Sequence, residues 1–222
     1  MKRVAAVVGD YYHRAEESGE ALQQALRTWA GASDVSLRFV DAGRIPVALA
    51  ETPDAVVLFK EDRVAPQEDE NARWMTAAIA EAIAKYVEQG GGWLAWHSGL
   101  ASYEPEGTYV SMLRGRFLFH PALHQTVRYT AASAEAGRDI LDLGGKNGFE
   151  ALDEHYFVEC DRGRTEVFLL SESVDGNSIA GWRHPYGHGR ICCLTPAHTR
   201  EGLFNPDFLR VLGSAVRWCC GE

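Results

Sequence analysis

The sequence has little positive charge. Its 22 Lys and Arg residues are outnumbered by 31 Asp and Glu residues, which gives a formal net charge of −9, and the arginines are scattered along the chain. Proteins that bind nucleic acid or an anionic membrane surface need a basic patch to neutralise phosphates. We therefore expect neither nucleic acid nor a membrane as a partner. A small polar or neutral ligand fits this composition better.

Long apolar runs and paired cysteine motifs are also absent. The apolar stretch 4–8 ends at Gly9, which makes it too short for the hydrophobic region of a signal peptide or for a membrane span. The five cysteines are an odd number and include adjacent pairs at 192–193 and 219–220. These positions match neither a zinc spacing nor a disulfide framework. We therefore expect reduced cysteines and a cytoplasmic protein.

Strand-like runs alternate with helical periodicity along the chain. In the first half, the sequence predicts strands at 4–8, 35–40, 55–59 and 93–96. It predicts helices at 22–29 and 67–89. The second half predicts a strand, a hairpin and a closing helix, at 166–170, 178–194 and 208–218. This alternation is typical of an α/β protein, a three-layer α/β/α sandwich with a mainly parallel sheet. Without a linker or repeat, the 222 residues are expected to form one domain, 1–222.

His97 follows the most informative stretch of the sequence. Three glycines at 90–92 end a helix, and the short apolar run 93–96 then predicts a central strand buried on both faces. Ligands of open α/β sheets bind outside the carboxyl ends of the strands, so His97 is predicted to act as a general base or metal ligand. The alternative is a core histidine that donates one hydrogen bond to a backbone carbonyl. The glycine run is not a phosphate loop, because such loops follow a strand.

Two further segments supply candidate catalytic groups. His198 follows the predicted strand at 190–194, with helix capping or loop packing as the alternative. Asp153 and Glu154 are adjacent, so on an extended segment they point to opposite faces. We interpret Glu154 as a catalytic acid or base and Asp153 as an orienting or hydroxyl-binding group. A solvated acidic turn is the alternative for this pair.

Four other residues are candidates for contact with a substrate. His13 lies in the loop after the first strand, which usually borders the crevice in this architecture, and His120 precedes a proline in a loop-rich region. Tyr156 and Trp182 could stack on the apolar face of a sugar ring, although aromatic residues in such segments also serve packing. The histidines in or beside predicted strands and hairpins are expected to face solvent and receive no role: His124, His184 and His188.

Six pieces of the sequence occur in the order that one known family shows. They are 90–98, 113–121, 153–156, Trp182 with 186–190, 197–199 and the closing helix 208–218. On these pieces the chain resembles, nearly end to end, the ThuA-like or trehalose-utilisation family of the class I glutamine amidotransferase-like superfamily. The resemblance implies a flavodoxin-like sheet. It also implies sugar metabolism, in which relatives accompany oxidoreductases that act on disaccharides and keto-sugars.

The resemblance also bears on the chemistry of His97. In amidotransferases of this superfamily a cysteine stands on a tight strand-to-helix turn between small residues. The resemblance places Ala95 and Gly99 at the small positions and His97 at the position of the nucleophile. Histidine cannot form the thioester needed to take nitrogen from glutamine. No glutaminase activity is therefore expected.

Three functions stay open at this point. The leading hypothesis is an enzyme that acts on a sugar or keto-sugar by general acid–base chemistry with His97, Glu154 and His198. The second is a non-catalytic sugar-binding or regulatory protein. The third is a metal-dependent hydrolase, in which a divalent ion such as zinc or manganese is held by His97 or His198 with a carboxylate. The expected partner is a small-molecule carbohydrate, and the sequence leaves homo-oligomer formation open.

Overall fold

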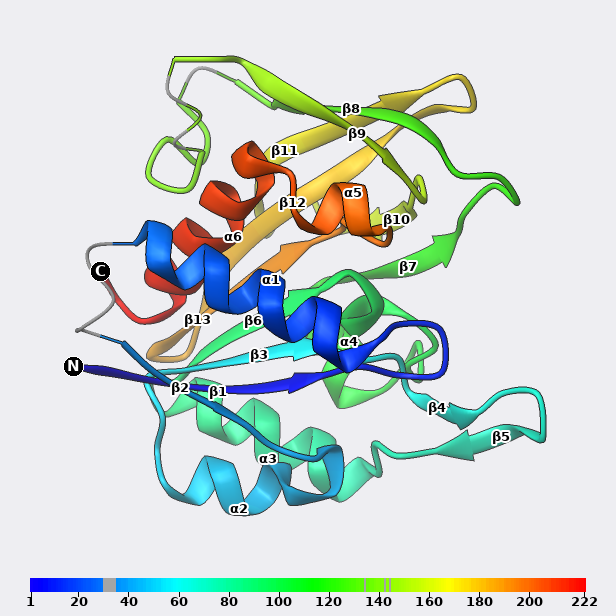
Figure 1. The fold of residues 1–222 in the computed structure, drawn as a ribbon. Helices are drawn as coiled ribbons and strands as arrows, with labels where there is room; N and C mark the ends of the chain where they lie inside the picture. The colour runs from blue at the N-terminus through cyan, green and yellow to red at the C-terminus, as the bar shows by residue number, and fades with distance from the viewer. Residues whose placement is uncertain (30–34, 134, 142, 144) are drawn as a thin grey trace.

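In the computed structural model, residues 1–29, 35–133, 135–141, 143 and 145–222 are described. Within them nine strands form one twisted sheet (Figure 1). The strands are, in sheet order, β2 (Val35–Phe39), β1 (Lys2–Val8), β3 (Ala55–Phe59), β6 (Gly92–Trp96), β13 (Gly189–Leu194), β12 (Gly176–Tyr186), β11 (Glu166–Ser173), β8 (Gln125–Ala131) and β9 (Gly148–Asp153).

The direction of the strands changes at β13. From β2 to β13 all neighbouring strands are parallel, and from β13 to β9 all neighbours are antiparallel. The predicted α/β class is confirmed, with a parallel core in a sheet that is mixed rather than mainly parallel, and so is the hairpin formed by β12 and β13. Because β13 pairs in parallel with β6 on one side, it joins the antiparallel half of the sheet to the strand that leads to His97.

Helices cover both faces of the parallel half, as Figure 1 shows. One core lies between the sheet and the long helices α1 (Ala15–Thr28) and α6 (Pro206–Cys219). A second core lies on the opposite face, under α2 (Ile45–Ala50), α3 (Ala77–Glu88) and α4 (Thr108–Leu113). In β3, Val57 belongs to the first core and its neighbour Leu58 to the second. This alternation explains why the strand is apolar at every position.

The predicted helix at 67–89 is wrong in its first half. Residues Arg63–Ala65 (β4) and Asp69–Arg73 (β5) instead form a hairpin that projects from the sheet. The helix α3 begins only after Thr76, whose Oγ1 accepts a hydrogen bond from the backbone N–H of Ile79. The polar stretch 67–73 has no apolar face that a helix could bury, so the helical periodicity starts only at Ile79.

Two smaller features complete the frame of the site. β7 (Gly115–Phe119) pairs antiparallel with β10 (Phe157–Cys160), away from the main sheet. This pairing brings the loop after β7 next to the segment before β10.

The five cysteines are free. In the described part of the chain, no helix has the length and apolar character needed to cross a membrane. The remaining short elements are η1 (Ala42–Arg44) and α5 (Arg200–Leu203).

Candidate functional site

The turn after β6 holds His97 in a left-handed backbone conformation. His97 has a φ of 47° and begins the short 3-10 helix η2 (His97–Leu100). Two residues later, Gly99 allows β3 to pass close to the turn, since a Cβ atom on Gly99 would lie 2.2 Å from the carbonyl oxygen of Leu58. The structure therefore contains a tight turn at the predicted position. Unusual backbone conformations of this kind are concentrated at functional sites.

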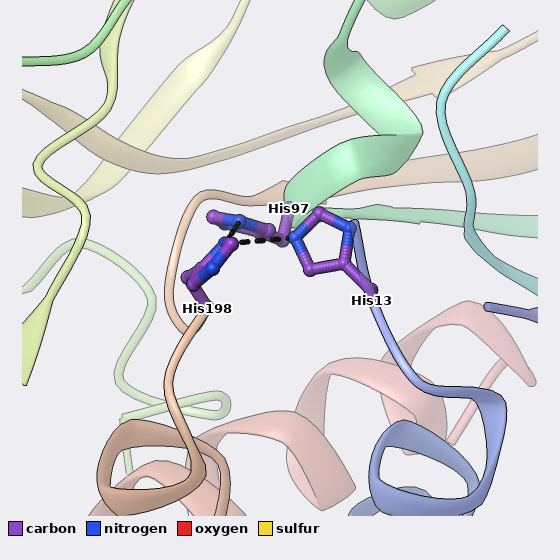
Figure 2. Close-up of side chains that lie close together, drawn as sticks. All are labelled: His13, His97 and His198. Atoms are coloured by element: carbon purple, nitrogen blue, oxygen red, sulfur yellow. Dashed lines mark hydrogen bonds between the residues drawn. The ribbon is translucent and has the colours of Figure 1, made fainter. Parts of the chain in front are cut away.

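Three histidines meet at the carboxyl edge of the sheet (Figure 2). His13 follows β1, His97 follows β6 and His198 follows β13. The Nε2 atom of His13 lies 2.9 Å from Nδ1 of His198, and Nε2 of His97 lies 3.4 Å from that same nitrogen. Because β1, β6 and β13 belong to the parallel half of the sheet, their carboxyl ends share one edge. The structure thus brings His97 and His198 together and adds His13.

Acceptors on the chain fix the orientation of two of these rings. Nδ1 of His13 lies 2.6 Å from Oδ1 of Asp10, and Nδ1 of His97 lies 2.7 Å from the carbonyl oxygen of Thr195. The contact with His13 outweighs burial and holds the pKa of Asp10 well below its usual value, so this carboxylate is ionised. A carboxylate and a carbonyl can only accept, so both Nδ1 atoms carry a hydrogen. In the neutral rings, Nε2 then presents a lone pair to the cluster.

Asp153 and Glu154 face in opposite directions at the end of β9. Asp153 is fully buried, where its Oδ1 accepts from the backbone N–H groups of Glu154 and His198 and its Oδ2 accepts from the Tyr129 hydroxyl. Burial raises the pKa of Asp153 to about 6. Both of its oxygens are occupied by donors of the chain itself. Asp153 therefore orients the segment that carries His198, and the structure gives it no contact that would suit a hydroxyl of a ligand.

Glu154 points into the cluster of histidines. Its Oε2 lies 3.1 Å from Nδ1 of His198 and 3.7 Å from Nε2 of His97. Its Oε1 lies 3.7 Å from the Nε2 atoms of both His120 and His124. One carboxylate is thus shared among four imidazoles, at the distance of a hydrogen bond for His198 and at longer range for the other three.

The pKa values within the cluster move in different directions. Burial lowers the pKa of His97 to about 4, so this ring is neutral near pH 7. Burial opposes ionisation of Glu154, but its contacts with the imidazoles of His198 and His97 outweigh it and lower its pKa well below the usual value. The same contact with Glu154 outweighs burial at His198 and raises the pKa of that imidazole. Separation of neighbouring titratable groups in this way is typical of sites that transfer protons.

A cavity of about 250 Å³ opens beside these side chains. Tyr156 forms one wall, stacked on the ring of His97 with 4.1 Å between ring centroids. The residues that line the cavity are Tyr12, His13, Glu61, Arg63, Ser98, Ala101, Ser102, Phe117, His120, Glu154, Tyr156 and His198. The volume is below the range of about 300–1,000 Å³ that holds drug-sized ligands, so it suits a small molecule.

Two predictions about individual residues fail in the structure. Trp182 does not reach the cavity, because β12 runs through the middle of the sheet and buries the indole, whose Nε1 donates to the carbonyl oxygen of Leu113 at 2.9 Å. His184, predicted to face solvent, is only 3% exposed. Its Nε2 lies 3.0 Å from the carbonyl oxygen of Met112. Both side chains therefore have structural roles.

Three residues of the site were not predicted from the sequence. Asp10 and Glu61 each follow a parallel strand, β1 and β3, so the rule that selected His97 would also have selected them. Glu61 is 2% exposed, and its Oε2 accepts from Arg63 and Ser102 while its Oε1 has no hydrogen-bond partner among the described residues. His124 carried no signal, because its contact with Glu154 depends on the path of the loop after β7.

Two sets of side chains could hold a metal ion in the described part of the chain. One ligand atom from each of His13, His97 and His198 lies within 4.8 Å of the others, and the same holds for His124, Glu154 and His198.

The sequence matches the family model for ThuA, trehalose utilisation, over residues 3–219. The chain belongs to the ThuA family. A ThuA-like protein from Parabacteroides merdae has a similar structure, with a TM-score of 0.75 and 14% identity over 99% of this chain and 90% of that one. The cytoplasmic protein STM3548 from Salmonella typhimurium is similar at a TM-score of 0.67 and 14% identity, over 99% of both chains.

The ThuA fold also resembles part of a larger enzyme. A β-galactosidase from Bacillus circulans sp. alkalophilus is similar at a TM-score of 0.64 and 11% identity, over 95% of this chain and 30% of that one. Identities this low show a shared fold alone. No curated protein matches the sequence.

Proposed function

We propose that this ThuA-family protein is an enzyme that acts on a keto-sugar by general acid–base chemistry at His97, Glu154 and His198. The observation that carries the proposal is the position of His97. Its Nδ1 is tied to the carbonyl oxygen of Thr195, so its Nε2 offers a lone pair next to Glu154 and His198, beside a cavity of about 250 Å³. The family's link to trehalose utilisation supports a carbohydrate as substrate.

The reaction class follows from what these groups can exchange. A carbon atom next to a carbonyl group can lose a proton if a base takes it while an acid protonates the carbonyl oxygen. In this proposal Glu154, which lines the cavity, takes the proton and passes it to Nε2 of the buried His97, 3.7 Å away, and His198, held 3.1 Å from Glu154, supplies the other. The product is an enediol. Return of the first proton to the neighbouring carbon, while His198 takes the proton of the other enediol hydroxyl, completes an isomerisation, and all three groups end in their starting protonation states.

The remaining cavity residues suit the recognition of a sugar ring. Tyr156 offers an aromatic face, and its neighbours His120 and Phe117 lie with ring centroids 6.2 and 4.3 Å away. Glu61 offers a buried carboxylate oxygen to a hydroxyl. Sugars combine apolar ring faces with hydroxyl groups, so this combination of stacking surface and acceptor fits them. We propose a cytoplasmic location as well, which the free cysteines and the name of the Salmonella protein support.

Deuterium exchange tests the proposed chemistry directly. A panel of keto-sugars, made by oxidising glucose, galactose and trehalose at ring hydroxyls, is incubated with the protein in D₂O and followed by NMR. We expect deuterium to enter the carbon next to the carbonyl, and the rate to fall at least about 100-fold in His97→Ala, the low end of what one acid–base group contributes. The matched control is His188→Ala, because His188 is an exposed histidine in the hairpin after β12.

Two results would contradict the proposal. Exchange at equal rates in wild type and His97→Ala would show that His97 does not accept the proton. Tight binding of a sugar without any exchange across the panel would favour the alternative of a non-catalytic binding protein. We also propose that the chain lacks glutaminase activity, since none of the described residues that line the cavity is a cysteine.

A further inference from the structure

The cluster of His13, His97, His198 and Glu154 has more acceptor lone pairs than hydrogens to share among them. If the rings are neutral, Nε2 of His13 and Nε2 of His97 are both acceptors, because each ring carries its hydrogen on Nδ1 toward Asp10 or Thr195. Both Nε2 atoms lie close to Nδ1 of His198, at 2.9 and 3.4 Å, and Oε2 of Glu154 lies 3.1 Å from that nitrogen. One hydrogen at most sits on Nδ1 of His198. It cannot satisfy three acceptors at once.

We propose that these groups bind one divalent transition-metal ion of the zinc class, with His13, His97 and His198 as ligands and Glu154 beside them. Imidazole nitrogen is a preferred ligand of such ions, and a dication satisfies converging lone pairs that a single hydrogen cannot. The ligand from His13 is new relative to what the sequence suggested, since it comes from a loop 185 positions away from His198 in the chain.

The spacing of the ligand atoms agrees with a tetrahedral site. Zinc lies about 2.0–2.1 Å from imidazole nitrogen, and the corners of a tetrahedron of that size are about 3.3 Å apart. The two contacts between imidazole nitrogens measure 2.9 and 3.4 Å. Both values lie within a few tenths of an ångström of the tetrahedral edge, and the three nitrogens lie within 4.8 Å of one another.

The groups behind the ligands are those that metal sites use. Histidine ligands usually donate their second N–H to a carboxylate or a backbone carbonyl, which fixes the ring and raises its basicity. His13 has the Asp10 carboxylate in this position and His97 has the carbonyl of Thr195. Asp153 holds the backbone N–H of His198 at 2.6 Å. The rings of His13 and His97 therefore have an outer partner in place before any ion arrives, and the backbone of His198 is fixed by Asp153.

The alternative set of His124, Glu154 and His198 is less suited. The side chain of His124 is 44% exposed, against 6% for His13 and 0% for His97. A buried ligand loses less conformational freedom on binding, so it contributes more to affinity. We therefore assign the ion to the set that contains His13.

The proposal rests on the proposed function only in that the ion and the keto-sugar share one cavity. A cation at this position would polarise the carbonyl oxygen of the substrate, the task that His198 has in the metal-free proposal. Glu154 would then exchange the proton without passing it to His97, because the three imidazole nitrogens would be ligands. The two proposals differ in one measurable respect, namely whether exchange of deuterium needs the ion.

Metal titration of the purified chain tests the site. Protein without an affinity tag is stripped with a chelator and titrated with Zn²⁺ by calorimetry and with Co²⁺ by visible absorption, in which tetrahedral cobalt gives intense bands. We expect one equivalent of either ion. Affinity should fall by more than about 100-fold in His13→Gln and by about 10- to 100-fold in Asp10→Asn, since loss of an outer partner alone has the latter effect. His188→Ala should bind as the wild type does.

Circular dichroism and thermal melting of each stripped variant show that it is folded before the comparison is made. Equal affinity in wild type and His13→Gln, or loss of binding in His124→Ala with retention in His13→Gln, would overturn the assignment. Absence of stoichiometric binding by the wild type would also overturn it. In that case deuterium exchange by the stripped protein would still support the metal-free proposal. A protein that neither binds metal nor exchanges deuterium would contradict both proposals.

Discussion

The close approach of β3 to the turn after β6 can be tested with one methyl group. In Gly99→Ala the added Cβ would lie 2.2 Å from the carbonyl oxygen of Leu58, whereas ordinary contacts begin at 3.4 Å. The oxygen belongs to a backbone inside a sheet, so it cannot rotate away as a side chain could. The turn and the strand must separate by roughly 1 Å, the difference between these two distances.

The expected cost is large for so small a change. Overpacking of a buried site costs about 1–3 kcal/mol and occasionally more, and we expect the upper end because backbone must move. For a chain of this length, 1 kcal/mol corresponds to about 2–4 °C in the melting temperature. A loss of about 3 kcal/mol thus predicts a melting temperature about 6–12 °C below that of the wild type. Displacement of the turn should also misplace His97, so metal affinity and deuterium exchange should fall together.

The matched control is Gly43→Ala, because a Cβ on Gly43 would meet no atom within 4 Å. This exposed change should leave the melting temperature within about 2 °C of the wild type, as surface substitutions usually cost less than about 0.5 kcal/mol. Calorimetric melting and Zn²⁺ titration of the two variants provide the comparison. Equal melting temperatures for Gly99→Ala and Gly43→Ala would refute the reasoning about the turn.

Three further predictions concern residues that do not line the cavity. Burial lowers the pKa of His184 to about 4 in the folded protein, so the unfolded state binds more protons below about pH 6.5 and stability falls as the pH decreases from 6.5 to 4, by up to about 3 kcal/mol. Urea denaturation at both pH values should show a smaller fall in His184→Gln, and an equal fall would contradict it. Asp153→Ala removes the acceptor of the His198 N–H and should cost about 1–3 kcal/mol, most of which Asp153→Asn recovers in the same assay. Asn205 accepts from two backbone N–H groups at the start of α6, so Asn205→Ala should cost about 1 kcal/mol without a change in metal affinity.

Local sequence was sufficient to predict the parallel half of the sheet. The central strands β1, β3 and β6 are short apolar runs, and buried strands of this kind depend little on their partners. The rule that ligands bind at the carboxyl ends of such strands then selected His97, His198 and His13. β8 was not predicted, although Val127 and Tyr129 are buried and alternate with exposed residues.

The remaining features depend on contacts between distant segments. Trp182 and a tryptophan that lines a sugar site look alike in sequence, and only the position of β12 inside the sheet separates them. The burial of His184 likewise depends on the position of β12, the strand to which it belongs. The contact of His124 with Glu154 arises from the pairing of β7 with β10. The helix predicted over 67–89 was wrong in its first half because the prediction extended the periodicity that begins at Ile79 back over a polar stretch.

The parallel pairing of β6 with β13 also has a consequence for how the protein folds. Arg190 lies opposite Gly92, so closing this pair requires a loop that contains the whole antiparallel half of the sheet. Contacts between residues so far apart in the chain form slowly. His198 joins His13 and His97 only when this pairing is complete, so an incomplete chain or a partly folded intermediate has no cluster. Cobalt absorption during refolding should therefore develop with the last and slowest phase, after the signal of the helices.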